Sequence, residues 1–230
     1  MNTDQSTVVI AIDGPSGSGK GTLSQMLARY LGYHLLDSGA LYRLVALAAI
    51  KRELDLSVEE LIIPVAANLD VQFVVADSSL TILLDGENVT NAIRQEIVGM
   101  NASRVAAYRG VRSSLLDRQR SFAMPPGLVA DGRDMGTVVF PDAIVKIFLT
   151  ASADARAERR FKQLQEKGEP VDKGALIADI IERDARDSNR SVSPLRPADD
   201  AVVIDSTNLG IEQVFNKMLE VTKAKIDLAF

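Results

Sequence analysis

The sequence predicts an α/β protein with a parallel β-sheet flanked by helices, and three observations support this fold class. Short β-branched runs alternate with segments in which apolar residues recur at helical spacing. A glycine-rich loop that ends in lysine lies between the first such run and the first helical segment. Two adjacent apolar runs within residues 71–84 predict a small antiparallel insertion in this otherwise alternating chain.

The first strand and the first helix follow from the N-terminal pattern. Residues 8–12 form a β-branched run that is bounded by Asp13, Gly14 and Pro15, which predicts a buried strand. Apolar residues at helical spacing then predict a helix that begins near Lys20 and stops at Gly32. The same kind of spacing predicts further helices at residues 41–54, 58–69, 95–107 and 111–122.

The antiparallel insertion is expected at about residues 70–90. Residues 71–75 and 80–84 are the two apolar runs, and residues 76–79 separate them. This arrangement predicts a β-hairpin with a four-residue turn.

The second half of the chain returns to the alternation of strands and helices. Alternating strands and helices imply right-handed crossovers, and therefore a parallel sheet with both faces covered. We find no internal repeat, low-complexity tract or flexible linker, and expect one domain over residues 1–230. Strands are expected at 128–131, 143–149 and 201–205, helices at 153–167, at 175–186 and from about 211, and an irregular polar segment at 187–197.

Composition excludes several classes of function. The chain has no cysteine, which removes disulfide frameworks, zinc–thiolate sites and thiol nucleophiles, and its only histidine, His34, is expected to be structural. The longest apolar run, residues 44–50, is far shorter than the roughly 20 residues that span a membrane. The first residues also lack the features of a signal peptide. We expect a soluble cytoplasmic protein that does not bind membranes.

The distribution of charge points to a local site for anions. A net charge of −5 argues against a general surface for nucleic-acid polymers. Arginine nevertheless outnumbers lysine 17 to 9, and 13 of the arginines lie between residues 104 and 196. The planar guanidinium group binds phosphate and carboxylate through paired hydrogen bonds. An acidic chain with arginine gathered in one region is therefore expected to bind an anion there.

The glycine-rich loop has the pattern G-x-x-x-x-G-K between a predicted strand and a predicted helix, which is typical of a P-loop. Glycines let successive backbone N–H groups point at one phosphate, and the helix N-terminus adds its positive dipole. Lys20 would reach the β- and γ-phosphates of a nucleotide. The expected ATP-binding loop consists of Gly14, Pro15, Ser16, Gly17, Ser18, Gly19, Lys20, Gly21 and Thr22.

One departure from the usual P-loop pattern narrows the classes of P-loop protein to which the chain can belong. The residue after the lysine is Gly21 instead of serine or threonine, and Thr22 follows it. Lys-Gly-Thr resembles the loop of nucleoside monophosphate kinases such as adenylate kinase. The guanine-reading Asn-Lys-x-Asp pattern is also missing, because Asn216 and Lys217 are followed by Met218 and Leu219. A signalling GTPase is therefore disfavoured.

Asp131 ends a predicted strand of the same sheet, where a carboxylate associated with Mg²⁺ is expected. Phosphoryl transfer depends mainly on positioning and on neutralising charge. An acceptor that is itself a phosphate already carries an anionic oxygen, so no catalytic base is obligatory. A chain with one histidine and clustered arginines fits that chemistry better than hydrolysis or phosphorylation of an alcohol.

Four segments carry a recognisable combination of motifs, and they are residues 13–22, 36–43, 130–137 and 182–187. In this order along the chain they together resemble the bacterial cytidylate kinases, and the resemblance spans nearly the whole chain. The family implies transfer of the γ-phosphate of ATP to CMP or dCMP, with Mg²⁺, by a monomer.

The resemblance also implies roles for individual residues. Arg112 and Asp134, with Ser103, would read cytosine, and uracil would leave their hydrogen-bonding groups unpaired. Thr22 and Asp131 would associate with the metal, and Arg159 would contact ATP. The catalytic set would be Lys20, Asp131, Arg133, Arg156 and Arg160. The CMP-binding set would be Ser38, Arg43, Ser103, Arg112, Arg133, Asp134, Arg183, Asp187 and Arg190.

The family also implies a monophosphate-binding region at about residues 38–112 and a mobile lid at about residues 153–170. Arg156, Arg159 and Arg160 share one face of the predicted lid helix, because they are three and four residues apart. Two alternatives stay open at this point. One is a P-loop kinase for another nucleoside monophosphate or small acceptor, and the other is a regulatory module that binds ATP.

Overall fold

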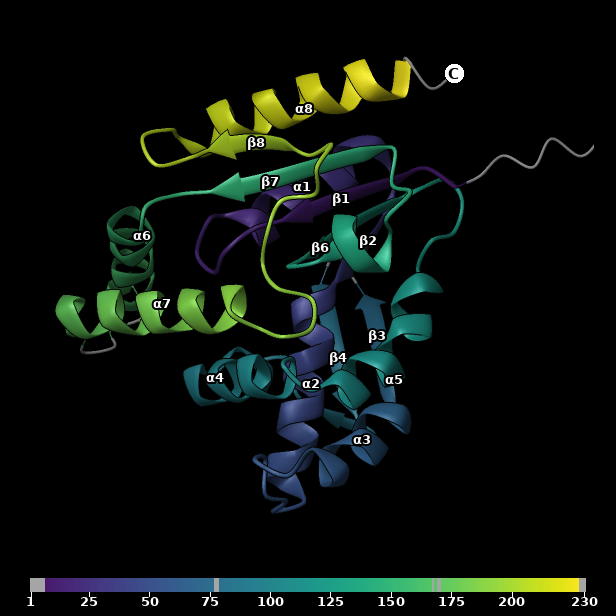
Figure 1. Cartoon of the computed structure of the whole chain (residues 1–230), viewed down its shortest axis with the longest axis vertical. Helices are drawn as coiled ribbons and strands as arrows, with labels where there is room; N and C mark the ends of the chain where they lie inside the picture. The colour runs from purple at the N-terminus through teal and green to yellow at the C-terminus, as the bar shows by residue number, and fades with distance from the viewer. Residues whose placement is uncertain (1–6, 77–78, 167, 169–170, 228–230) are drawn as a thin grey trace, which may run out of the picture. The chain divides into compact units, whose positions relative to one another are not determined.

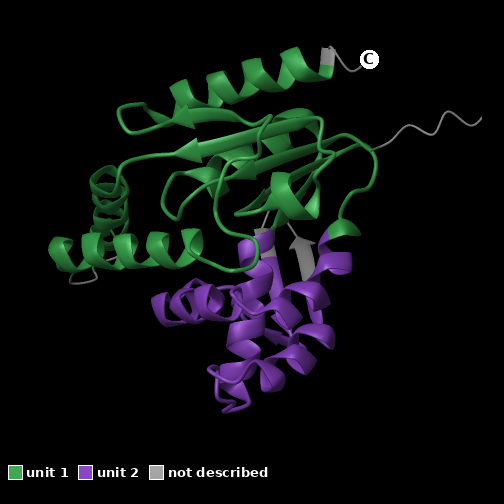
Figure 2. Ribbon diagram, in the orientation of Figure 1, with its two compact units in different colours: residues 1–37, 120–230 green, residues 38–119 purple. Residues whose placement is uncertain are grey.

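The computed structural model describes residues 7–76, 79–166, 168 and 171–227. Figure 1 shows the order of its helices and strands, and Figure 2 shows the two compact units into which the chain divides. Unit 1 consists of Met1–Asp37 and Arg120–Phe230, and unit 2 is Ser38–Gln119. Unit 2 is therefore an insertion in the sequence of unit 1.

Unit 1 is built on a five-stranded sheet with the order β2-β6-β1-β7-β8. Every pair of neighbouring strands is parallel, which confirms the predicted sheet. The strand β1, which leads into the glycine-rich loop, lies in the middle of the sheet between β6 and β7. The strands are β1 (Val9–Asp13), β2 (His34–Asp37), β6 (Leu128–Gly132), β7 (Val145–Thr150) and β8 (Val202–Asp205).

Two helices of unit 1 contact each other and pack against the sheet in one hydrophobic core. These are α1 (Lys20–Leu31) and α8 (Ile211–Asp227). Leu27 of α1 and Met218 of α8 are fully buried in one cluster with Ile12 and Ile147 of the sheet. As predicted, α1 ends at Gly32. This glycine forms the C-cap, because its φ is 69° and its N–H donates a hydrogen bond to the carbonyl of Arg29.

In the rest of unit 1, the described residues form two α-helices and a π-helix. The helices α6 (Ala153–Glu166) and α7 (Lys173–Ser188) follow β7 and contact each other. The predicted helix at 153–167 agrees with α6, but Lys167 and residues 169–170 of the expected lid lie outside the described residues. A five-residue π-helix, η2 (Met135–Val139), follows β6. Such short π-helical segments are frequent at functional sites.

Unit 2 combines helices with a separate three-stranded antiparallel sheet of order β3-β4-β5. Its helix α2 (Ser38–Lys51) is apolar around most of its circumference and almost wholly buried, as expected for a central helix. The other elements are α3 (Glu59–Ala67), β3 (Val71–Ala76), β4 (Ser79–Leu84), β5 (Glu87–Asn88), the 3₁₀-helix η1 (Ala92–Arg94), α4 (Glu96–Val105) and α5 (Arg109–Arg120).

The structure corrects three details of the predicted elements. The strands β3 and β4 each extend one residue further than predicted, because Ala76 pairs with Ser79, and the connecting residues 77–78 lie outside the described ones. The strand β2 was not predicted, because it is only four residues long and shows no clear apolar run. The helix α2 begins three residues before the predicted start, since Ser38 and Gly39 carry no apolar signal. Within the described ranges, no helix is long and apolar enough to cross a membrane.

Candidate active site

The glycine-rich loop connects the middle strand β1 to the N-terminus of α1. Gly14 has a φ of 148°, and a Cβ atom placed on it would lie 1.9 Å from the carbonyl oxygen of Leu149 in β7. Only glycine fits this close approach. Ser18 Oγ donates a hydrogen bond to the carbonyl of Pro15 over 3.0 Å, which closes the loop on itself. The loop therefore ends with the free N–H groups of a helix start, a favourable setting for phosphate.

Lys20 is the buried cation of this loop. Its Nζ donates a hydrogen bond to the carbonyl of Pro15 over 2.9 Å and lies 4.0 Å from Oδ1 of Asp131 in β6. Burial lowers the pKa of Lys20, Arg133 lowers it further, and Asp131 opposes both effects. Burial likewise raises the pKa of Asp131, against the opposing effect of Lys20. An anion bound at the loop would stabilise the ammonium form of Lys20.

Asp131 also lies beside the first turn of α1. A Cβ atom placed on Gly21 would lie 3.6 Å from Oδ2 of Asp131, and Thr22 is the next residue along this turn. Among the described residues, no cluster of three or more metal-binding side chains occurs. Mg²⁺ is usually held by one or two protein oxygens together with water and substrate phosphates. The Thr22 hydroxyl and the Asp131 carboxylate fit such a sparse donor set.

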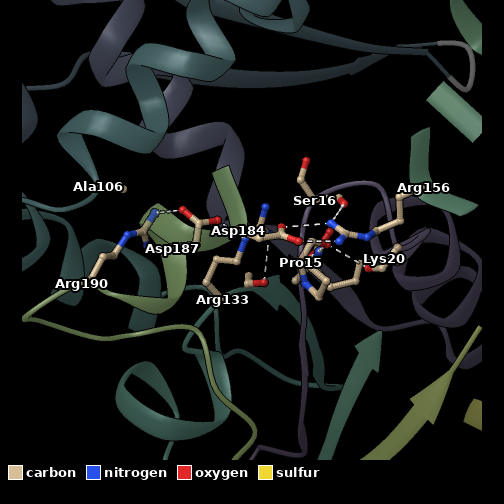
Figure 3. Close-up of polar contacts among 12 residues, drawn as sticks. Pro15, Ser16, Lys20, Ala106, Arg133, Arg156, Asp184, Asp187 and Arg190 are labelled. Atoms are coloured by element: carbon tan, nitrogen blue, oxygen red, sulfur yellow. Dashed lines mark hydrogen bonds and ion pairs between the residues drawn. The ribbon is translucent and has the colours of Figure 1, made fainter. Parts of the chain in front are cut away.

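Asp187 forms ion pairs with two of the arginines that were predicted to bind CMP. It lies in α7 and is almost fully buried. Its Oδ2 accepts a hydrogen bond of 3.0 Å from Nε of Arg133, and its Oδ1 pairs with Arg190, as Figure 3 shows. Burial acts to raise the pKa of Asp187, but Arg133, Arg190 and Arg183 outweigh it and hold the pKa below its usual range. The structure thus brings Arg133 together with predicted residues from the end of α7 and just after it, which are more than fifty positions away in the sequence.

Two of the three predicted lid arginines contact the phosphate-binding loop. Arg156 is buried, forms a two-pronged ion pair with Asp184, and donates a hydrogen bond of 3.0 Å to the carbonyl of Ser16 (Figure 3). Arg159 donates to the carbonyl oxygens of Ser206 and Ser18. Arg160 lies in the same helix, α6.

Sequence reasoning missed two partners of the predicted arginines. Asp184 holds Arg156, and Ser206, at the carboxyl end of β8, holds Arg159. Asp184 was within one of the recognised segments, and the position of Ser206 follows a general rule, because ligands of open α/β sheets bind at the carboxyl ends of strands. His34, expected to be structural, has its Nε2 3.0 Å from the carbonyl oxygen of Pro125.

Unit 2 carries the other part of the predicted CMP-binding set. Ser38, the first residue of α2, donates a hydrogen bond of 2.6 Å to Oε1 of Gln119. Arg43 donates to the carbonyl of Ile93 over 2.8 Å. Ser103 is buried in α4. These contacts hold polar side chains in fixed positions within the unit.

Arg112 is a buried cation of unit 2. Its Nη1 donates a hydrogen bond of 3.0 Å to the carbonyl of Ala106, and its guanidinium carbon lies 5.5 Å from the centre of the Tyr42 ring. An arginine over an aromatic face gains a favourable cation–π interaction. The remaining predicted base-reading residue, Asp134, belongs to unit 1, where it is buried directly before η2.

Comparison with known proteins decides the family. Residues 10–224 match the family model for cytidylate kinase, which includes residues of both units. The chain belongs to the cytidylate kinase family. It is therefore a nucleoside monophosphate kinase, and the resemblance inferred from the four sequence segments is confirmed.

Its relatives in this family match along most of their length. A cytidylate kinase of Photobacterium profundum is 61% identical over 206 residues, which cover 90% of each chain. One of Shewanella denitrificans is 58% identical over 222 residues, 96% of this chain and 98% of that one. One of Pseudomonas aeruginosa is 60% identical over 213 residues, 92% of this chain and 93% of that one.

Proposed function

We propose that this chain transfers the γ-phosphate of ATP to CMP or dCMP, giving ADP and CDP or dCDP. The observation that carries the proposal is the high identity to cytidylate kinases over a chain that also holds a buried P-loop lysine, Lys20, beside Asp131. The proposal assigns ATP binding to residues of unit 1.

ATP binding is assigned to the loop of residues 14–22. The backbone N–H groups at the start of α1 would bind the phosphates, and Lys20 would neutralise part of their negative charge. The lowered pKa of Lys20 in the free protein supports this role, because an ammonium group that is poorly solvated gains most from a bound anion. Arg159, which reaches the loop carbonyl of Ser18, would contact the nucleotide once it is bound.

The acceptor phosphate is assigned to Arg43, Arg133 and Arg190, with Ser38 as a polar contact. Arg133 and Arg190 are already paired with the buried Asp187, so both guanidinium groups are oriented before substrate arrives. Preorganised cations of this kind stabilise charge that develops in phosphoryl transfer without further rearrangement. Arg183 and Asp187 would also contact the sugar or the phosphates of the bound nucleotide.

The base is assigned to Arg112, Asp134 and Ser103. Cytosine presents acceptors at O2 and N3 and donors at its exocyclic amine, which match the donor groups of a guanidinium and the acceptor oxygens of a carboxylate. Arg112 and Asp134 are both buried, and a buried partner left unpaired by uracil costs about 1–3 kcal/mol. Selection of CMP over UMP follows from this penalty.

No general base is required in this proposal, because the acceptor oxygen is already anionic near neutral pH. The charge of two phosphate groups must instead be neutralised and water excluded. Arg156 and Arg160 would add positive charge beside the loop, and we propose that residues of about 153–170 close over ATP. Arg156 is held by Asp184 in the free protein, so such closure would require this ion pair to rearrange or to move as a unit.

Magnesium is the proposed cofactor, with the Thr22 hydroxyl and the Asp131 carboxylate as its protein contacts, through water in the case of Asp131. When bound with ATP, Mg²⁺ supplies charge neutralisation at the β- and γ-phosphates. The expectations of a single domain with a monophosphate-binding region at about residues 38–112, of a monomer and of a cytoplasmic location stay predictions.

The test is the formation of CDP from ATP, Mg²⁺ and CMP by the wild type and by two arginine variants. Arg133→Met should lower kcat by about a hundredfold or more, as expected when a preorganised charge on the transferring phosphate is lost. Arg29→Met is the matched control, because Arg29 lies exposed in the last turn of α1 and is not among the residues assigned to either substrate. A near-normal kcat of Arg133→Met would remove Arg133 from the reaction, and absence of CDP with the wild type would overturn the proposal.

A further inference from the structure

A buried carboxylate in unit 1 has no role in the proposal above. Asp13 is the last residue of β1 and directly precedes Gly14, and its side chain is 4% exposed. Its Oδ1 accepts the backbone N–H of Met135, and its Oδ2 accepts the backbone N–H of Gly136, each over 2.8 Å. A single side chain thus joins the strand that carries the phosphate-binding loop to the segment after β6.

The two N–H groups that Asp13 binds follow Asp134 directly. Met135 and Gly136 are the first residues of η2, and the first N–H groups of a helix have no partner within the helix. The carbonyl of Asp134 in turn accepts the N–H groups of Val138 and Val139. The backbone around Asp134 is therefore held on one side by η2 and on the other by Asp13.

The burial of Asp13 is costly, which argues for a specific benefit. Desolvation raises the pKa of Asp13 to about 7, against the opposing effect of the two hydrogen bonds from η2. The nearby Asp134 carboxylate raises this pKa further, and Lys20 lowers it. Asp13 therefore interacts electrostatically with one residue assigned to the base and one assigned to ATP. A neutral serine or asparagine would serve at a helix N-terminus without the cost of a buried charge.

We propose that Asp13 is a positioning residue, which fixes Asp134 relative to the phosphate-binding loop and thereby determines selectivity for cytosine over uracil. The inference rests on the proposed function, in which Asp134 contacts the base. Asp13 itself touches neither substrate. Its two carboxylate oxygens are required because each binds a different N–H group.

Asp13→Asn tests the inference, because it keeps the shape of the side chain and replaces one acceptor by a donor that would face a backbone N–H. The ratio of kcat/KM for CMP to that for UMP should fall about tenfold, the effect of one buried hydrogen bond misplaced. The KM for CMP should rise, while the KM for ATP should stay within about twofold, since the loop retains its own contacts. Asp55→Asn is the control, because Asp55 is exposed and accepts the N–H of Ser57.

A double-variant cycle separates positioning from a general structural role. If Asp13 acts through Asp134, Asp13→Asn should change the CMP-to-UMP ratio less than about twofold in a background of Asp134→Ala, because coupled sites are not additive. A purely structural Asp13 would instead lower kcat for both acceptors equally and leave the ratio unchanged in both backgrounds. That result would overturn the inference and leave the proposed function intact.

Asp13→Glu is the second test variant, for use if Asp13→Asn does not fold. Glutamate keeps both acceptor oxygens and displaces them by one methylene group, so the selectivity ratio should fall between those of the wild type and Asp134→Ala. A ratio equal to that of the wild type, in a folded Glu variant, contradicts the inference. Failure of the wild type to phosphorylate CMP at all would instead contradict the proposed function.

Discussion

Nε of Arg133 donates a hydrogen bond of 3.0 Å to Oδ2 of Asp187, and Arg190 pairs with the other oxygen of the same carboxylate. This relationship connects the residue after β6 to the last turns of α7 within unit 1. Two cations that are assigned to the acceptor phosphate therefore share one buried anion.

Loss of the Asp187 charge should destabilise the protein in a pH-dependent way. The pKa of Asp187 in the folded protein lies below its ordinary value, so the carboxylate stabilises the fold above about pH 4, and this contribution is lost as the pH falls through the folded pKa. Asp187→Asn should lower the free energy of unfolding by about 3 kcal/mol at pH 7, because it leaves buried arginines without their anion. Urea unfolding at pH 7 and at pH values below about 4 measures the difference. A difference between wild type and variant that does not shrink in acid contradicts this expectation.

Gly14 should be irreplaceable for a steric reason. Its Cβ position lies 1.9 Å from the Leu149 carbonyl oxygen, so Gly14→Ala requires the backbone of β7 or of the loop to move. We expect a loss of about 3 kcal/mol or more of unfolding free energy. Gly32→Ala is the matched control, because Gly32 also has a positive φ but has nothing within 4 Å of its Cβ position, and should cost about 1–2 kcal/mol. Equal losses in thermal or urea unfolding would refute the steric argument.

Removing one partner of the Ser38–Gln119 hydrogen bond should lower the free energy of unfolding, because a buried group is left unpaired. Both side chains are buried, and Ser38 Oγ donates to Gln119 Oε1 over 2.6 Å. Gln119→Leu should lower the unfolding free energy by about 1–3 kcal/mol, because the serine hydroxyl loses its acceptor. Adding Ser38→Ala should recover part of this loss, as replacing both partners removes the unpaired group. Strictly additive losses in urea unfolding would show that the two residues do not depend on each other.

The parallel sheet, most helices and the P-loop could be predicted because each rests on a local pattern in the sequence. The strand β2 could not, since within it only Leu36 is fully buried and His34 and Asp37 are exposed. The ends of β3 and β4 were also predicted one residue too short, because residues that fit a turn can equally extend a strand pair. In both cases the pairing depends on a partner strand.

For the candidate site, too, some features could be predicted from local sequence, and others depend on residues that are distant in the chain. Lys20 and its loop follow from spacing alone, and the arginines of the acceptor set follow from resemblance to the family. The contacts that orient them do not, because Asp13 to Gly136 and Asp184 to Arg156 join residues that are distant in the chain. Both carboxylates lie in segments that resemble the family, but only the fold shows what they bind.

The most direct test is the release of ADP from ATP and Mg²⁺ by the wild type with CMP, dCMP, UMP, AMP and GMP in turn. Rapid release with CMP and dCMP, slower release with UMP and negligible release with the purine nucleotides are expected from the proposed roles of Arg112 and Asp134. Turnover that is fastest with UMP or a purine monophosphate would contradict these roles. Absence of ADP release with every acceptor, by a protein that still binds ATP, would contradict the proposed cytidylate kinase activity itself.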